Sequence, residues 1–466
     1  MRKITLLLSA FIIVCTAFAQ EITGEWNGVL KVQAMQLKLV FHITKNSDGY
    51  TATMDSPDQG VKGISVTTAT FEDPKLELEI KNIGIEYEGE LKDKTIEGTF
   101  KQGGLSLPLN LTRDSVITTS LKRPQEPAPP YPYYVEEVSF PNAGANITLS
   151  GTLTLPKKEG NYPAVILITG SGPQNRDEEI FGHKPFLVIA DYLTRNGIAV
   201  LRYDDRGTAR STGDFKTATS ADFATDVESA IKYLKGRKEI NQNKIGLVGH
   251  SEGGLIAPMV AARSKDVHFV VLLAGTGLRG DQLLLLQQEM IARASGIPAT
   301  DIQKGRAVNA KAFQIVADAT SSDSLKTTLA AYLKQVVNDS ASGISVPSGM
   351  TADQFISLET NQITNPWMEY FIKYNPATAL EKVKCPVLAV NGEKDVQVAA
   401  NENLTAIKSA LEKGGNKNVT IKTYPNLNHL FQECTTGLPT EYATIEQTFS
   451  HVVLNDIIKW IQQQMR

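Results

Sequence analysis

The stretch Gly249-His250-Ser251-Glu252-Gly253 places one serine hydroxyl between two glycines, after the apolar run "KIGLV" and before a helical pattern. A nucleophilic serine at a strand-to-helix turn takes a strained backbone conformation. Glycines beside it avoid collisions because they lack a Cβ atom. The pattern predicts that Ser251 is a nucleophile in acyl transfer, with a plain turn serine as the alternative.

A serine hydroxyl is a weak nucleophile until a base accepts its proton, and the chain has six histidines. Only His429, in "YPNLNHLFQE", follows the last predicted strand at its carboxyl end, level with Ser251. The other five histidines are placed elsewhere: His42 in an N-terminal β segment, His183 before the first helix, His250 within the pentapeptide, His268 at the amino end of a strand and His451 inside the last helix. We predict that His429 is the general base and that His250 packs under the turn.

The base needs a buried acid at its other ring nitrogen. Asp395, in "LAVNGEKDVQV", comes just after the penultimate predicted strand and therefore lies at the same edge of the sheet. Glu393, two residues earlier, is the alternative. The predicted triad is Ser251, Asp395 and His429, in that chain order.

A tetrahedral intermediate also needs hydrogen-bond donors for its oxyanion. The backbone N–H of Glu252 heads the helix after the serine and supplies one. The second is expected from the loop Thr169–Asp177, "TGSGPQNRD", where we assign the N–H of Ser171. A phosphate-binding loop is the alternative for this glycine-rich segment, but the lysine and the following Ser/Thr of a P-loop are missing.

Apolar strands and helical stretches must hold these residues in place. Six apolar runs are "AVILIT", "GIAVLRY", "KIGLVGH", "HFVVLLAG", "CPVLAVNG" and "VTIKTYP", and helical patterns such as 185–196 and 222–237 lie between most of them. Alternation of this kind predicts a mostly parallel sheet that is covered on both faces. "VEEVSF" and "ITLSGTLTLP" are expected to form an antiparallel pair at its entry. A helical insertion, about 278–375, interrupts the alternation and is expected to cap Ser251.

Short alternating runs from residue 22 to 113 predict a separate all-β module, a barrel or sandwich. The expected organisation is a β module at 20–121, a proline-rich linker at 122–134 and an α/β domain at 135–466. Residues 1–19 have a basic start, an apolar stretch and small residues before the expected cleavage at Ala19, so we predict a signal peptide and export. Cys15 leaves lipid modification as an alternative, and the apolar stretch is shorter than a membrane span.

The bulk composition excludes some classes of function. The net charge is −3, with 42% hydrophobic and 21% charged residues, and no basic run suggests nucleic acid. Cys385 and Cys434, expected at opposite ends of the sheet, are predicted to stay free thiols because a disulfide needs Cα atoms within about 7 Å. The oligomeric state is not predicted.

Five motifs resemble those of bacterial α/β-hydrolase-fold esterases, which are related to serine aminopeptidase-like and prolyl-oligopeptidase-like hydrolases. They are "ITGSGPQNRD", "RYDDRGTARSTGD", "GLVGHSEGG", "NGEKDVQV" and "NLNHLF". The resemblance covers roughly 135–466 and implies an α/β-hydrolase fold that hydrolyses a small-molecule carboxylic ester without a cofactor or metal ion. It also implies that the turn around Arg206 supports the active-site floor, through either ion pairing or substrate contact. Thr169 stands where many relatives carry histidine, which leaves the backbone donor intact.

Three functions are compatible with these residues. The first is an exported serine esterase with an acyl-enzyme on Ser251. The second is a serine aminopeptidase acting on short peptides, which needs acidic side chains for the substrate ammonium; the insertion has a few, such as Asp281 and Glu289, without an obvious cluster. The third is a ligand-binding protein on a vestigial hydrolase fold, against which the intact triad argues.

Overall fold

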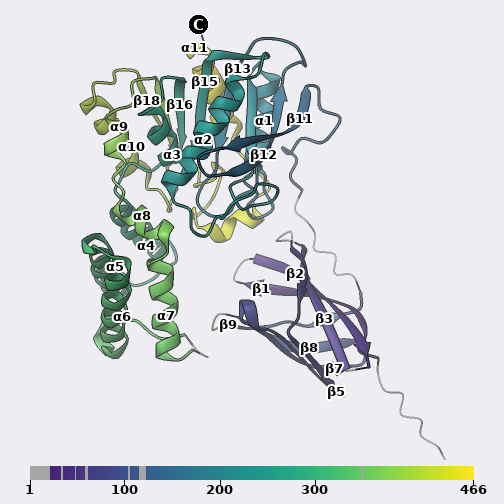
Figure 1. Ribbon diagram of the computed structural model, residues 1–466. Helices are drawn as coiled ribbons and strands as arrows, with labels where there is room; N and C mark the ends of the chain where they lie inside the picture. The colour runs from purple at the N-terminus through teal and green to yellow at the C-terminus, as the bar shows by residue number, and fades with distance from the viewer. Residues whose placement is uncertain are drawn as a thin grey trace, which may run out of the picture. The chain divides into compact units, whose positions relative to one another are not determined.

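The structure is a computed structural model that describes residues 21–32, 35–47, 49–57, 61–102, 105–114, 122–347 and 350–465. The chain divides into two compact units between Thr119 and Ser120 (Figure 1). The predicted leader, with Cys15 and Ala19, lies outside the described residues and stays a prediction.

The first unit is an antiparallel half-barrel. Its described strands run in the order β4-β3-β2-β1-β10-β8-β7-β6-β5, with β9 beside β8. β4 and β5 lie at opposite ends of this order, yet only Val66 and Thr67 separate them, so the sheet must curl until its edges approach. Trp26, Phe41 and Tyr87 are buried inside it. The predicted all-β module is therefore confirmed as a fold.

The strand bounds of this unit follow from its alternating sequence. They are β1 (Gly24–Val32), β2 (Met35–Asn46), β3 (Gly49–Ser56), β4 (Val61–Ser65), β5 (Thr68–Glu72), β6 (Lys75–Ile80), β7 (Ile85–Lys92), β8 (Thr95–Gln102), β9 (Leu105–Pro108) and β10 (Leu111–Thr112). In β6, residues alternate between exposed and buried, as a strand with one solvated face requires.

The second unit is built on an eight-stranded sheet in the order β11-β12-β14-β13-β15-β16-β17-β18. The β11–β12 and β12–β14 pairs are antiparallel and the remaining pairs are parallel. The bounds are β11 (Tyr134–Asn142), β12 (Ile147–Leu155), β13 (Tyr162–Ile168), β14 (Ala199–Tyr203), β15 (Ile240–His250), β16 (Val267–Leu273), β17 (Val387–Gly392) and β18 (Val419–Tyr424). The central strands are buried almost throughout, which explains their continuous apolar runs.

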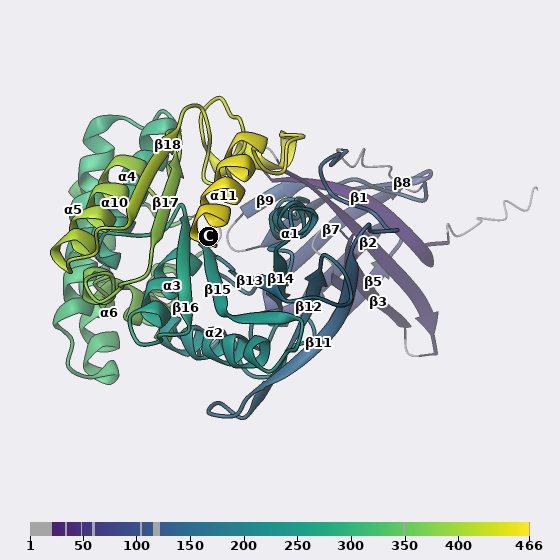
Figure 2. The ribbon, with the colours of Figure 1, turned by 90° about the horizontal axis from the view of Figure 1, so that it is seen from above.

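Helices cover both faces of this sheet (Figure 2). α1 (Pro185–Arg195) and α11 (His451–Gln464) pack on one face around Phe186 and Ile457. α2 (Ser220–Lys235), α3 (Gly253–Ala261) and α10 (Ala400–Lys413) pack on the other around Leu255 and Ile407. The arrangement is the predicted α/β-hydrolase fold, and it brings the ends of β13, β15, β17 and β18 to one edge.

The segment between β16 and β17 is the predicted helical insertion. It contains α4 (Gly280–Ala294), α5 (Ala299–Asp318), α6 (Ser322–Asn338), α7 (Ala352–Ile363), α8 (Pro366–Lys373) and the short α9 (Ala377–Leu380). α5, α6 and α7 pack around Leu329 and Ile356 in a small core of their own. Within the described residues, no helix is both long and apolar enough to cross a membrane.

Candidate active site

Ser251 stands at a sharp turn between β15 and α3. Its φ angle is +52°, in the left-handed region, and its backbone N–H donates to the Leu273 carbonyl oxygen over 2.9 Å. A Cβ atom on Gly249 would lie 2.0 Å from the Gly253 carbonyl oxygen, and one on Gly253 would lie 2.1 Å from the Ile168 carbonyl oxygen. The two glycines are therefore required by close packing of the backbone, as the sequence predicted.

His429 and Asp395 meet at the same edge. His429 Nδ1 lies 2.7 Å from Asp395 Oδ2, and both side chains are buried. Asp395 Oδ1 accepts the N–H groups of Gln397 and Val398, each over 2.8 Å, so the carboxylate is held on both oxygens. The alternative acid, Glu393, is exposed and is not the partner of His429.

Among the described residues, no hydrogen bond joins Ser251 to His429, but His429 lies against His250, the residue before the serine. The neighbouring ring of His250 donates from Nε2 to the His429 carbonyl oxygen over 3.0 Å, and the two imidazole centroids are 4.8 Å apart. Among the described residues, the partner found for the His429 ring is Asp395 at Nδ1, which leaves Nε2 free to accept a proton. Catalytic hydrogen bonds of this kind are commonly long in an enzyme without substrate.

The predicted oxyanion loop lies directly against the serine. A Cβ atom on Gly170 would come within 3.3 Å of Ser251 Cβ. The N–H of Gly170 already donates to Glu178 Oε1 over 2.7 Å. Within the described part of the chain, by contrast, no acceptor takes the N–H of Ser171 or of Glu252. These two donors are therefore available to a ligand.

The turn after β14 holds this loop in place through two aspartates. Asp205 accepts the Thr169 hydroxyl over 2.7 Å and the Gln174 N–H over 2.9 Å. Asp204 accepts the Arg176 side chain at both oxygens, over 3.0 and 2.8 Å. Burial raises the pKa of Asp205 well above its usual range, because desolvation outweighs these hydrogen bonds.

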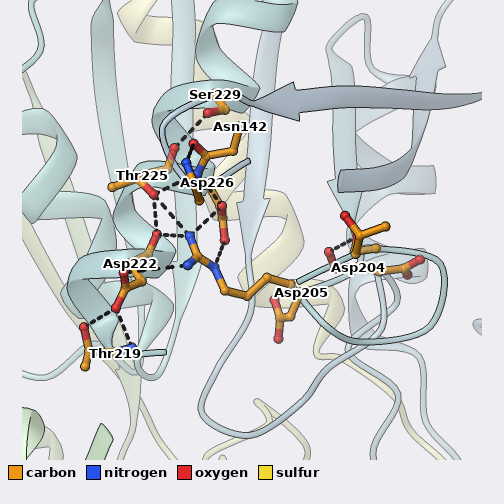
Figure 3. Close-up of polar contacts among 12 residues, drawn as sticks. Asn142, Asp204, Asp205, Thr219, Asp222, Thr225, Asp226 and Ser229 are labelled. Atoms are coloured by element: carbon orange, nitrogen blue, oxygen red, sulfur yellow. Dashed lines mark hydrogen bonds and ion pairs between the residues drawn. The ribbon is translucent and has the colours of Figure 1, made fainter. Parts of the chain in front are cut away.

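Arg206 in the same turn is engaged by protein groups, among them Asp222 and Asp226, which are labelled in Figure 3. Its Nε and Nη2 donate to the two carboxylate oxygens of Asp226 over 2.7 and 2.9 Å, and Nη2 also donates to the Asp222 carbonyl oxygen. Asn142 donates to Asp226 from the opposite side over 2.7 Å. Both charges are buried, so the interpretation of Arg206 as a structural ion pair is confirmed.

Glu252 links the serine turn to the helical insertion. Its carboxyl group is buried, and Oε1 accepts Ser220 Oγ over 2.6 Å and Trp367 Nε1, from α8, over 2.7 Å. Burial raises the pKa of Glu252, and the two hydrogen bonds only partly oppose this. Trp367 stacks on Phe371 with centroids 5.0 Å apart, and Phe371 is buried in the main core. The sequence did not reveal the contact between α8 and Glu252.

Glu178, like the contact between Trp367 and Glu252, was not predicted from the sequence. It is buried, and its Oε1 accepts the Gly170 N–H and lies 2.9 Å from His250 Nδ1. Its φ angle of +51° is unusual for a glutamate. A local signal was lacking because Glu178 lies in a polar loop whose partners come from other segments.

The remaining candidates have structural roles or none in the site. His183 is buried against Thr448 and the Tyr442 carbonyl oxygen, and burial lowers its pKa to about 4. Cys385 and Cys434 are free thiols. In the described residues, no group of three or more side chains is arranged to hold a metal ion.

Comparison with known proteins identifies the family. A sequence profile of the X-Pro dipeptidyl-peptidase (S15 family), Peptidase_S15, matches residues 144–422, which is more than half of the chain. The chain belongs to the S15 family. The match includes β15 and β17 and the residues Ser251 and Asp395 that follow them. It makes this chain a serine hydrolase of the α/β type, as the five motifs implied.

Individual relatives of this S15-family hydrolase include esterases. Esterase EstD of Thermotoga maritima is 27% identical over 385 residues, which covers 81% of each chain. Among solved structures, esterase PF2001 of Pyrococcus furiosus aligns with a TM-score of 0.45 and 16% identity over 74% of this chain and 98% of its own. Est1E of Butyrivibrio proteoclasticus, solved with ferulic acid, aligns with a TM-score of 0.40 and 16% identity over 70% and 99%.

Proposed function

We propose that this S15-family hydrolase is a serine esterase that cleaves a small-molecule carboxylic ester through an acyl-enzyme on Ser251. The observation that carries the proposal is the 2.7 Å contact between His429 Nδ1 and Asp395 Oδ2 beside a strained serine. This contact orients the imidazole and leaves its Nε2 lone pair available as a base.

The reaction follows from these positions. Ser251 Oγ attacks the ester carbonyl carbon while His429 Nε2 takes its proton, and Asp395 stabilises the resulting imidazolium. The oxyanion accepts hydrogen bonds from the N–H groups of Ser171 and Glu252. The imidazolium then protonates the departing alcohol. A water molecule, deprotonated by the same ring, then attacks the acyl carbon; the bond to Ser251 Oγ breaks, the acid leaves, and the imidazolium returns the proton to Oγ.

Ion pairing neutralises several acidic side chains of the insertion, which supports ester cleavage over peptide cleavage. A peptidase that recognises a free amino terminus needs an acidic side chain for the substrate ammonium. In the insertion, Asp281 is paired with Arg279, Glu289 with Arg293 and Arg306, and Glu369 with Lys373. Esterase EstD, which aligns with most of the chain, supports the same choice.

Release of X-Pro dipeptides from a peptide is the second candidate, because the matching family is described as an X-Pro dipeptidyl-peptidase. The test compares p-nitrophenyl acetate and butyrate with aminoacyl- and Xaa-Pro-p-nitroanilides, using the purified wild type and the Ser251→Ala variant. We expect the wild type to turn over the esters, and the variant to lose several orders of magnitude in rate. Turnover of the anilides alone would reverse the order of the two candidates. Unchanged ester hydrolysis by the variant would remove Ser251 from its assigned role.

We also propose that the enzyme is exported, with mature protein starting at Gln20. The basic and apolar start of the sequence and its small residues before Gln20 support this. Intact mass and amino-terminal sequencing of the protein from the exported fraction test it. A retained leader, or a lipid on Cys15, would contradict the proposed cleavage.

A further inference from the structure

A second pair of a buried acid and a buried histidine lies beside the first. Glu178 follows the oxyanion loop and His250 immediately precedes Ser251, and their side chains are 4% and 8% exposed. Their contact, Oε1 to Nδ1, is 2.9 Å long. None of the steps assigned to Ser251, His429 and Asp395 uses this pair.

The hydrogen bonds of the pair determine where its protons lie. His250 Nε2 faces the carbonyl oxygen of His429, which can only accept, so Nε2 carries a proton. One further proton lies between His250 Nδ1 and Glu178 Oε1. The same Oε1 accepts the Gly170 N–H over 2.7 Å, and hydrogen bonds donated to a carboxyl oxygen favour its ionised form. The geometry therefore favours a proton on Nδ1 and a charged pair.

The electrostatic surroundings agree with this assignment. Desolvation by itself would lower the pKa of His250, but Glu178, the His429 carbonyl oxygen and the charge of Asp395 together raise it. The ionisable side chains packed around the ring are thus Glu178 and His429, with Asp395 behind His429.

The pair connects three segments that must keep a fixed geometry. Through Gly170 it holds the loop that contains Ser171, and through the His429 carbonyl oxygen it holds the main chain of the proposed base. His250 itself belongs to the serine turn. We propose that Glu178 and His250 form an imidazolium–carboxylate pair that positions the oxyanion loop and His429 around Ser251. The inference rests on the proposed function of that site.

The left-handed backbone of Glu178 supports a specific role. A non-glycine residue at φ +51° is strained, and such strain persists only where the surroundings fix it. The next residue, Glu179, has the same side chain but is exposed, with its polar contacts to Asn175 and Lys184 at the surface. It provides a matched control.

Kinetics test the positioning role. In Glu178→Gln, one amide oxygen replaces the carboxylate and the charge is lost, so the loop and His429 are held less firmly. We expect kcat for p-nitrophenyl butyrate to fall on the order of 10²-fold with little change in KM, because small misplacements of reacting groups act on the chemical step. Glu179→Gln should behave like the wild type. An unchanged kcat in Glu178→Gln, or an equal fall in Glu179→Gln, would overturn the inference.

Neutron diffraction from deuterated wild-type crystals at neutral pD tests the charge state without a variant. We expect deuterium on both Nδ1 and Nε2 of His250 and none on Glu178. Deuterium on Glu178 Oε1 with a bare Nδ1 would overturn the inference. Neither result depends on turnover, so the failure of the proposed function, seen as full activity in Ser251→Ala, remains distinguishable from the failure of this pair.

Discussion

The hydrogen bond between Trp367 and Glu252 allows a quantitative prediction about stability. Replacing Trp367 with phenylalanine keeps an aromatic ring for the stack on Phe371 but removes the Nε1–H that Glu252 Oε1 accepts over 2.7 Å. Hydrogen bonds to charged groups contribute about 1.5–3 kcal/mol. Some packing is also lost, so at a pH where Glu252 is ionised we expect the free energy of unfolding to fall by about 2–4 kcal/mol.

The cost of Trp367→Phe should depend on pH. Burial raises the pKa of Glu252 above its ordinary value of 4.5, and the Trp367 hydrogen bond lowers it. An acid with a raised pKa in the folded state contributes stability below its unfolded pKa, and that contribution is lost as the pH rises through the folded pKa. Without the Trp367 donor, the pKa of Glu252 in the folded state lies still higher. Between the folded-state pKa of the wild type and that of the variant, the variant therefore still loses stability as the pH rises, whereas the wild type does not. The cost therefore grows with pH, at up to about 1.4 kcal/mol per pH unit.

Trp460→Phe is the matched control. Trp460 is buried, whereas Trp367 is partly buried, and the Nε1 of Trp460 donates over 3.1 Å to the neutral hydroxyl of Thr420. Its cost should therefore be flat with pH. Urea unfolding followed by circular dichroism at 222 nm between pH 5 and 9 measures both variants, because the α-helices of the described residues all lie in the second unit. Equal and pH-independent costs for the two variants would refute the reasoning.

Three further predictions concern the triad, the buried ion pair and two glycines. Asp395→Asn should lower kcat by about 10³–10⁴-fold in ester hydrolysis assays, because the asparagine disturbs the His429 tautomer, while Glu393→Gln should stay near the wild-type rate. Arg206→Met leaves Asp226 buried without its cation and should cost about 3–5 kcal/mol in urea unfolding, whereas Arg210→Met, at an exposed side chain, should cost less than about 0.5 kcal/mol. Gly249→Ala places a Cβ atom 2.0 Å from the Gly253 carbonyl oxygen and should abolish activity or soluble expression. Gly305 lies inside α5 with open space around it, so Gly305→Ala should instead raise the free energy of unfolding by about 0.5–1 kcal/mol.

The elements that carry the triad were predictable because each has a strong local pattern. β15 and β17 are buried on both faces, so their apolar runs are continuous, and the residues that follow them necessarily reach the same edge of a parallel sheet. Asp395 was preferred to Glu393 on position alone. The contact with His429 Nδ1 and the two backbone donors on Asp395 agree with that preference.

The supporting groups were not predictable because their partners are distant in the chain. Glu178 meets His250 across 72 residues, and Trp367 meets Glu252 across 115. In the sequence, Glu178 is one acid in the polar run "NRDEE", and Trp367 lies on a helix where an apolar position more often indicates core packing. Phe371, on the same helix, is indeed core. Only the tertiary structure distinguishes Trp367, which donates to Glu252, from Phe371, which packs in the core.

Backbone strain connects the predictable and the unpredictable parts of the site. Four residues that come after strands of the sheet have φ between +50° and +58°. Ser251 follows β15, Ala274 follows β16, Phe431 comes after β18, and Glu178 lies in the loop after β13. None of these residue types favours the left-handed region, so each position costs on the order of 1 kcal/mol or more. Only Ser251 was flanked by glycines that made the turn readable from the sequence. At the other three positions the fold imposes the conformation, which locates the strain at the edge of the sheet where the hydroxyl, the imidazole and the oxyanion loop have to be held.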